Sequence, residues 1–224
     1  MRFRVATFNV HHCRGSDGRV DVARVAGVIA TTEADLVALQ ELDRGMERSG
    51  GMDQPAELAT LLQMEVAFFP TLHRDGGEYG IGIAARPGAS DAGFHALPQV
   101  GEEEPRGVIT AIWSGLHVAC AHLGTKPRVL NAQVPALATF AAGLSPPAVV
   151  LGDLNRTARH LTPLLVGGFR GAFGHGTLPR RFPKRQIDHI LVSSDIDIVS
   201  SWTLRTRASD HLPLIAELEL TGSA

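Results

Sequence analysis

The stretch AVVLGDLNRT, residues 148–157, starts as an apolar run and ends with an acid, an apolar residue and an amide. Its first five residues suit a buried strand. Side chains two positions apart on a strand share a face, so Asp153 and Asn155 should point the same way. The ending is also what a simple turn requires, because Gly, Asp and Asn supply turn chemistry. The rest of the chain decides between a turn and a functional site.

The bulk properties are those of a globular protein. The chain has 224 residues, 44% of them hydrophobic and 20% charged, with no internal repeat or linker, so we expect a single domain over residues 1–224. The net charge of −2 gives no general attraction to nucleic acid or anionic membranes, and any polyanion would need a local patch. The two cysteines, Cys13 and Cys120, fit neither a disulfide framework nor a zinc spacing.

The N-terminal residues and the hydropathy of the chain predict a location. MRFRVATFNVHHC lacks the apolar core of a signal peptide. No segment approaches the ~18 apolar residues that span a bilayer. We therefore expect a cytoplasmic protein without a membrane span, whose oligomeric state is left open.

Short apolar runs bounded by turn residues predict about ten strands. Helical spacing of apolar residues predicts helices at 21–33, capped by Asp21, at 53–63, with Asp53 and Pro55 at its start, and at 128–143, with a weaker helix at 158–167. In the third helix Pro135 should cause a kink or a late start, and Gly143 should end it. The predicted strands are residues 4–10, 35–41, 65–70, 79–86, 107–113, 116–123, 148–155, 188–193, 198–205 and 213–220.

Ten strands are too many for a single open sheet, and several of them are apolar on both faces. Two stacked sheets with helices outside satisfy both observations. The expected fold class is therefore α+β, a four-layer α/β/β/α sandwich with two mixed sheets packed face to face.

Polar side chains mark the ends of these strands. Four runs end in a functional group and two later runs begin with one, so all six ends would meet at one edge if the later strands run antiparallel to the earlier ones. Carboxylate and amide oxygens are the donors that Mg²⁺ or Mn²⁺ prefers over zinc. With two histidines nearby, such an edge suits hydrolysis of a phosphate ester. The residues are Asn9, Glu41, His122, Asp153 with Asn155, Asp188, and Asp210 with His211.

Several ordered motifs resemble one known family. ATFNVHH, ALQELD, GGEYGIGIAAR, AHLG, VVLGDLN, IDHILVS and ASDHLPLIAEL occur in the order seen in the endonuclease/exonuclease/phosphatase superfamily, to which deoxyribonuclease I belongs. The resemblance extends from about residue 4 to residue 220. It implies the same four-layer sandwich and a Mg²⁺- or Mn²⁺-dependent phosphoric ester hydrolase.

The resemblance also implies residue roles. Glu41 is similar to the principal metal ligand, with Asn9 and Asp210 in or near the metal shell. Asp153 resembles the residue that positions the attacking water, and Asn155 its neighbour at the phosphate. His211, oriented by Asp188, and His122 are similar to the two histidines that contact the phosphate in the family. Glu78 is the expected orienting residue of His122, and Tyr79 is expected to line the same pocket. Which group activates the water, and whether one or two metals bind, stays open.

Some positions depart from the family pattern. Ile81 stands where many relatives have Asn, and His11 stands where some nucleases have an acid. The other histidines are expected to be ordinary surface or strand residues. Whether His12 faces the cleft is left open. Arg106 matches a position where relatives often carry Arg, and a substrate contact is expected there. The basic run at 180–185, with Arg181, is either a solvated loop or a grip on a second phosphate or nucleic acid.

Three functions remain open at this point. The first is a phosphodiesterase, such as an endonuclease or exonuclease acting on DNA. The second is a phosphatase for a small molecule or a phospholipid headgroup, which the near-neutral charge favours. The third is a non-catalytic module that binds phosphate or nucleic acid on the same fold.

Overall fold

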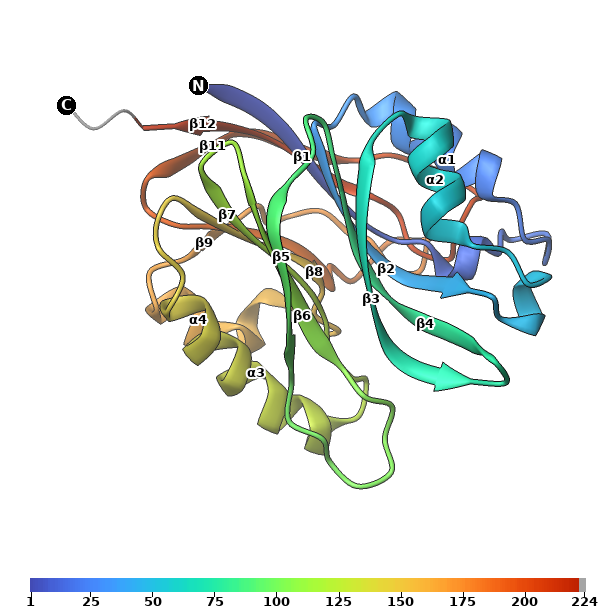
Figure 1. Cartoon of the computed structure of the whole chain (residues 1–224). Helices are drawn as coiled ribbons and strands as arrows, with labels where there is room; N and C mark the ends of the chain where they lie inside the picture. The colour runs from blue at the N-terminus through green and yellow to red at the C-terminus, as the bar shows by residue number, and fades with distance from the viewer. Residues whose placement is uncertain (222–224) are drawn as a thin grey trace.

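The apolar runs of the sequence form two six-stranded mixed sheets that pack face to face (Figure 1). A computed structural model describes residues 1–221, so the last three residues of the predicted domain lie outside the described residues. The first sheet contains, in spatial order, β11 (Ile196–Thr203), β12 (Leu214–Leu220), β1 (Arg2–Asn9), β2 (Leu36–Arg44), β4 (Gly77–Ala85) and β3 (Glu65–Arg74). The second contains β5 (Ser90–Ala96), β6 (Gly107–Trp113), β7 (Leu116–His122), β8 (Ala148–Asp153), β10 (Asp188–Val192) and β9 (Arg170–Gly171).

Helices cover the outer face of each sheet. α1 (Val22–Thr32) and α2 (Gln54–Leu62) pack on the first sheet, and α3 (Pro127–Ala142) and α4 (Thr162–Val166) pack on the second (Figure 1). A third apolar cluster fills the space between the sheets. The predicted four-layer sandwich is confirmed. Within residues 1–221, no helix is long and apolar enough to cross a membrane.

The two predicted N-cap residues cap their helices in the structure. The Asp21 carboxylate accepts the backbone N–H of Arg24 at 2.8 Å, and the Asp53 carboxylate accepts that of Ala56 at 3.0 Å. Each cap satisfies an amide that has no partner within the helix. α3 begins at Pro127 and continues through Pro135 to Ala142, so Pro135 does not delay its start.

Two strands were not predicted. β5 has the sequence SDAGFHA, and all of its residues are exposed or half-buried because it is an edge strand. Such a strand needs no alternating apolar face, which is the signal that identifies strands in a sequence. β9 has only two residues, too few to carry a pattern.

The strand directions bring the polar ends together. β8 runs parallel to β7 and antiparallel to β10, so Asp153 is paired in register with His122 on one side and Asp188 on the other. In the other sheet β12 runs antiparallel to β1, which places the loop before Leu214 beside the end of β1. The later strands are thus antiparallel to the earlier ones at these pairings, as the convergence of polar ends requires.

Gly152 fixes the path of β8 just before Asp153. Its φ is 148°, and a Cβ at this position would lie 1.9 Å from the backbone oxygen of Ala121 on β7. Only a glycine therefore allows β7 and β8 to approach this closely.

Gly152→Ala is expected to destabilise the fold by at least about 3 kcal/mol, because neither the backbone angle nor the contact tolerates a Cβ. The measurement is the midpoint of urea unfolding. Gly27→Ala is the matched control, since Gly27 lies in α1 with no atom within 4 Å of the added carbon, and it should be neutral or slightly stabilising. Equal midpoints for the Gly152 variant and the wild type would contradict this account.

Candidate active site

Asp153 lies at the centre of the polar edge, at the end of β8, and is buried. The backbone N–H of Asn155 donates to Asp153 Oδ1 at 2.9 Å, and Asn155 Nδ2 donates to the Leu123 carbonyl at 2.9 Å. GDLN therefore forms a turn after the strand, and the hydrogen bond from Asn155 in this turn also orients Asp153. The turn and the candidate site thus share the same residues.

Asn9 connects the two sheets at this edge. Its Nδ2 donates to Glu41 Oε1 at 2.8 Å and to Asp153 Oδ2 at 3.0 Å, while its Oδ1 accepts the backbone N–H of His11 at 3.0 Å. Asn9 ends β1 in the first sheet, and Asp153 ends β8 in the second. One amide thus holds both carboxylates, and the predicted place of Asn9 in the metal shell stays a prediction.

His211 is held by a buried ion pair. Its Nδ1 lies 2.8 Å from Asp188 Oδ2, and its Nε2 lies 3.8 Å from Asp153 Oδ2. Burial lowers the pKa of His211, but the charge and hydrogen bond of Asp188, helped by Asp153 and Asp210, outweigh it and raise the pKa to about 10. At neutral pH this site therefore holds an imidazolium that faces Asp153.

His122 is the neutral counterpart of His211. Arg106 Nη1 lies 3.0 Å from His122 Nδ1. A guanidinium can only donate, so Nδ1 accepts and the ring proton is on Nε2, which lies 3.7 Å from Asp153 Oδ2. Burial, then the charges of Arg106 and His211, lower the pKa of His122 well below its ordinary value.

The predicted partner of His122 is replaced by another residue. Glu78 pairs with Arg44 and lies 3.5 Å from His73, so Arg106, and not Glu78, orients His122. Arg106 also donates to the Tyr79 hydroxyl at 3.3 Å. Tyr79 is buried, and its predicted place in the substrate pocket stays a prediction. Glu78 stands apart from the other predicted site residues.

The environment of Asp153 suits a proton acceptor. Burial, and then the charge of Asp188, raise its pKa to about 7, against the opposing effects of His211 and Asn9. A carboxylate of ordinary pKa is a weak base at neutral pH, whereas one tuned toward the working pH takes a proton from water more readily. A perturbed acid flanked by two histidines is typical of a catalytic centre.

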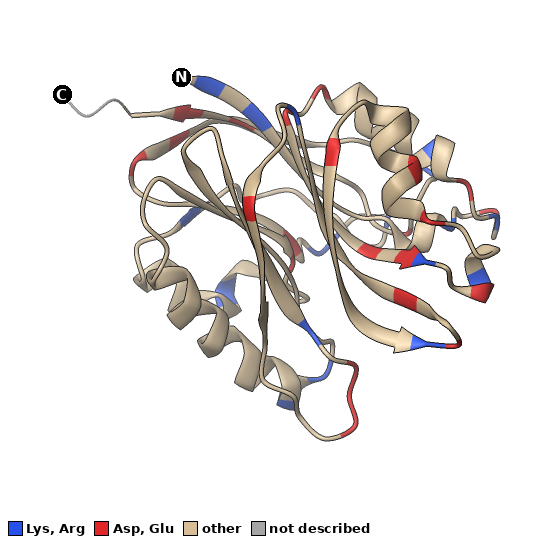
Figure 2. Cartoon of the chain, viewed as in Figure 1, with Lys and Arg blue, Asp and Glu red and all other residues tan. Residues whose placement is uncertain are grey.

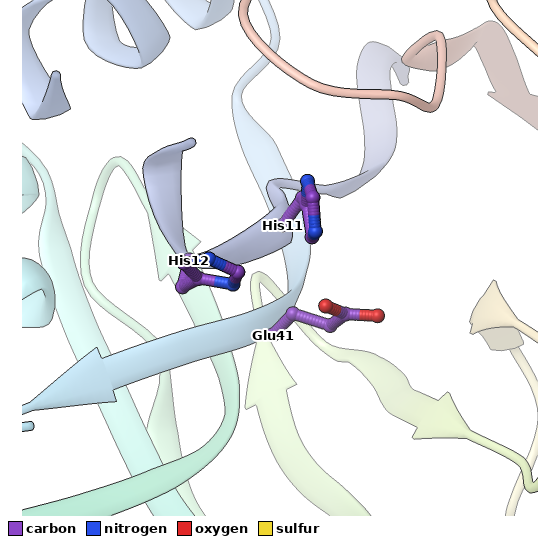
Figure 3. A group of neighbouring side chains, drawn as sticks. All are labelled: His11, His12 and Glu41. Carbon is purple, nitrogen blue, oxygen red and sulfur yellow. The ribbon is translucent and has the colours of Figure 1, made fainter. Parts of the chain in front are cut away.

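Glu41 lies beside two histidines that the sequence assigned to ordinary surface or strand positions. One donor atom each from His11, His12 and Glu41 lie within 4.8 Å of one another (Figure 3). His11 and His12 thus lie next to Glu41, the predicted principal metal ligand. Burial, and then the charge of Arg48, lower the pKa of His12 to about 4. Its imidazole is neutral at physiological pH.

Two predicted residues are exposed. Asp210 is exposed, and its Oδ1 is 3.7 Å from His11 Nδ1. Arg181 is also exposed and lines a groove of about 460 Å³. Figure 2 shows that charged residues lie mainly in loops and at strand ends. The basic run at 180–185 supplies only part of this groove, whose lining residues are Arg180, Arg181, Phe182, Arg205, Thr206 and Arg207.

Ser209 contacts two of the predicted site residues but was not itself among the predicted ones. Its hydroxyl donates to the Asn9 carbonyl at 2.8 Å and accepts the backbone N–H of His211 at 3.2 Å. It therefore ties the loop that carries Asp210 and His211 to the end of β1. Ser209 stands within the motif ASDHLPLIAEL, and that membership is the signal that could have identified it.

Comparisons with known proteins bear on the family and the fold. The chain matches the Endonuclease/Exonuclease/phosphatase family over residues 6–211. Among curated proteins, no sequence matches significantly. Solved structures share the fold at low identity. An endonuclease/exonuclease/phosphatase from Beutenbergia cavernae has a TM-score of 0.83 and 22% identity over 99% of this chain and 72% of its own.

Two further structures carry names that specify more. A mannosyl-6-phosphatase from Bacteroides thetaiotaomicron has a TM-score of 0.75 and 17% identity over 97% of this chain and all of its own. The human Nocturnin catalytic domain, with bound sulfate, has a TM-score of 0.73 and 18% identity over 98% of this chain and 94% of its own. At such identities the likeness shows the fold alone. The family match over residues 6–211 shows more: the chain belongs to the Endonuclease/Exonuclease/phosphatase family.

Proposed function

We propose that the protein hydrolyses a phosphate ester by directing a water molecule at phosphorus with the help of a divalent metal ion. The observation that carries the proposal is the surroundings of Asp153. Its Oδ2 accepts from Asn9 at 3.0 Å and lies 3.7 Å from His122 Nε2 and 3.8 Å from His211 Nε2. A proton acceptor thus lies between two groups that can bind phosphoryl oxygens.

The charge states of the three groups complement a phosphate. Asp153 accepts the proton that the water loses as it attacks. The His211 imidazolium, held by Asp188, donates to a phosphoryl oxygen and stabilises the negative charge that develops there. His122 donates its Nε2 proton to a second oxygen, and Arg106 holds the tautomer that makes this possible.

Glu41 fits the role of metal ligand. Its Oε1 is oriented by Asn9. Glu41 has a φ of 61° and lies within β2 at a bulge, where the register with β4 shifts between Gln40 and Leu42. A Mg²⁺ or Mn²⁺ ion bound there would neutralise a phosphoryl oxygen and the leaving oxygen. Asp210 Oδ1 lies 3.7 Å from His11 Nδ1.

The proposal is tested by assays of hydrolysis with and without Mg²⁺ or Mn²⁺. The substrates are bis-p-nitrophenyl phosphate, nicked DNA, sugar phosphates and phospholipid headgroups. We expect turnover of at least one ester that EDTA abolishes. Glu41→Gln should raise the metal concentration for half-maximal activity by about 10–100-fold, because a carboxylate ligand becomes a neutral amide. Glu47→Gln, at an exposed position of the next turn, is the control.

Two outcomes would contradict this reading. Activity of Glu41→Gln with the metal dependence of the wild type would remove Glu41 from the metal site. Tight binding of a phosphate ester without turnover, in every metal tried, would support a non-catalytic binding module instead.

The basic groove supplies the test between a nucleic acid and a small substrate. Arg181 and Arg205 line the same groove although 24 positions separate them in the sequence. If the substrate is a nucleic acid, Arg181→Gln/Arg205→Gln should weaken DNA binding and reduce the slope of log affinity against log salt by about 1–2, because each phosphate contact releases counterions. Arg2→Gln, which removes a cation at the start of β1, is the control. An unchanged slope, with normal hydrolysis of a small ester, would identify a small substrate.

A further inference from the structure

The chain makes an unusual turn directly after β1. His11, His12 and Cys13 have φ angles of 49°, 42° and 59°, and Glu41, beside them on β2, has 61°. These left-handed conformations are unfavourable for residues with a Cβ and are concentrated at functional sites in proteins. Asn9 supports the turn by accepting the His11 N–H and by holding Glu41. The backbone is therefore arranged to present two consecutive imidazoles to one carboxylate.

The side chains at this turn form a compact donor set. Figure 3 shows both imidazoles on the same side of Glu41, and one donor atom from each of the three residues lies within 4.8 Å of the others. An ion with bonds of about 2.1 Å spans at most about 4.2 Å between two ligands, so small rotations of the side chains would close the site. The ring centroids of His11 and His12 are 4.5 Å apart and their planes are inclined by 68°, so the rings are not stacked.

A second observation concerns His12 by itself. His12 is only 9% exposed, and its Nδ1 is buried with no hydrogen-bond partner within residues 1–221. Buried polar atoms nearly always have a partner, and an exception calls for an explanation such as an ion. The nearby Arg48 does not supply one, because Asp43 holds its guanidinium through two hydrogen bonds, at 2.8 and 2.7 Å.

The donor types select among metals. Mg²⁺ takes oxygen ligands almost exclusively, whereas imidazole nitrogen suits Zn²⁺ and its neighbours among the transition metals. Two histidines and one glutamate are one of the ligand sets of zinc sites that keep an open position for water or substrate. The composition of this cluster is therefore not that of a magnesium site.

We propose that His11, His12 and Glu41 form a divalent-metal site that prefers Zn²⁺ or Co²⁺ to Mg²⁺. The inference deepens the metal dependence proposed above, since it shares Glu41 with that site. It assigns metal selectivity to two histidines of this chain, one of which stands where some nucleases have an acid. Asp210 Oδ1 lies 3.7 Å from His11 Nδ1, outside the group of three mutually close donors.

The test is titration of the metal-free full chain with Co²⁺, followed by the visible absorption of the bound ion and then by competition with Zn²⁺ or Mg²⁺. We expect saturable binding, displacement by Zn²⁺ at a concentration at least about 100-fold lower than Mg²⁺ requires, and about 10–100-fold weaker binding for His11→Gln and for His12→Gln. The control is His95→Gln, which changes an exposed histidine on the edge strand β5. Equal Co²⁺ affinities for all four proteins, or equal competition by Mg²⁺ and Zn²⁺, would overturn the proposal.

A measurement on the wild type tests the proposal even if the variants fail to fold. Pulsed EPR of bound Mn²⁺ should show coupling to imidazole ¹⁴N, and the absence of that coupling would overturn the proposal without any substitution. Binding is measured without substrate, so the two proposals fail separately. Nitrogen ligation without hydrolysis of any ester would contradict the proposed function, whereas Mg²⁺-dependent hydrolysis with no histidine involvement would contradict only the selectivity.

Discussion

Asp153→Asn is expected to lower kcat/KM for phosphate-ester hydrolysis by about 1000-fold. The amide is nearly isosteric and can still accept the Asn155 N–H that Asp153 Oδ1 accepts at 2.9 Å, but it cannot take a proton from water. Removing a positioned proton acceptor costs about 10²–10⁴ in rate. It also removes the negative charge that faces both imidazoles at 3.7 and 3.8 Å.

The measurement is steady-state kinetics at saturating metal, with circular dichroism to confirm the fold. Asp91→Asn, on the exposed edge strand β5, is the matched control and should retain wild-type activity. An Asp153→Asn enzyme within tenfold of the wild type would assign the proton acceptor to another group.

His211→Gln should have the second largest effect, a loss of about 100–1000-fold in kcat. The wild-type imidazolium is aimed at the site by the 2.8 Å contact with Asp188, and a preorganised donor to a developing oxyanion contributes about this much. Asp188 contacts His211 directly, so Asp188→Asn should cost only about 10–100-fold, the effect of losing a partner that orients a functional group. The rates of both single variants and of the double variant provide the measurement.

The double variant distinguishes positioning from direct action. If Asp188 serves only to hold and charge His211, Asp188→Asn/His211→Gln should be no slower than His211→Gln alone. Multiplying losses would show that Asp188 acts independently of His211. His95→Gln, on the same edge strand as Asp91, is the control for removal of an exposed imidazole.

Much of the architecture could be predicted because it depends on local patterns. Runs apolar on both faces required cover on both sides, and their number required two sheets. Asp21, Asp53 and Gly143 marked helix ends, and the structure uses each of them there. β5 escaped prediction because an edge strand with no fully buried residue carries no periodic signal.

Some predicted site residues are brought together by strand pairing, whereas the partners of others depend on side-chain directions. Asp153, His122 and Asp188 meet because their strands are in register, and strand ends can be located in a sequence. Glu78 was expected at His122 but pairs with Arg44, because the choice between two nearby partners depends on side-chain directions across a sheet. Arg106 takes that place from the residue directly before β6.

The sequence by itself determined the kinds of chemistry available: carboxylates, amides and imidazoles at the ends of apolar strands, in an order that identifies the family. The tertiary structure alone decided their arrangement and charge. Asn9 holds acids 32 and 144 positions away, and burial beside Asp188 raises the pKa of Asp153 while Asp188 outweighs the effect of burial on His211. The left-handed turn that brings His11 and His12 to Glu41 is equally a product of folding. Distances between groups far apart in the chain, and the removal of water from around them, exist only in the folded molecule.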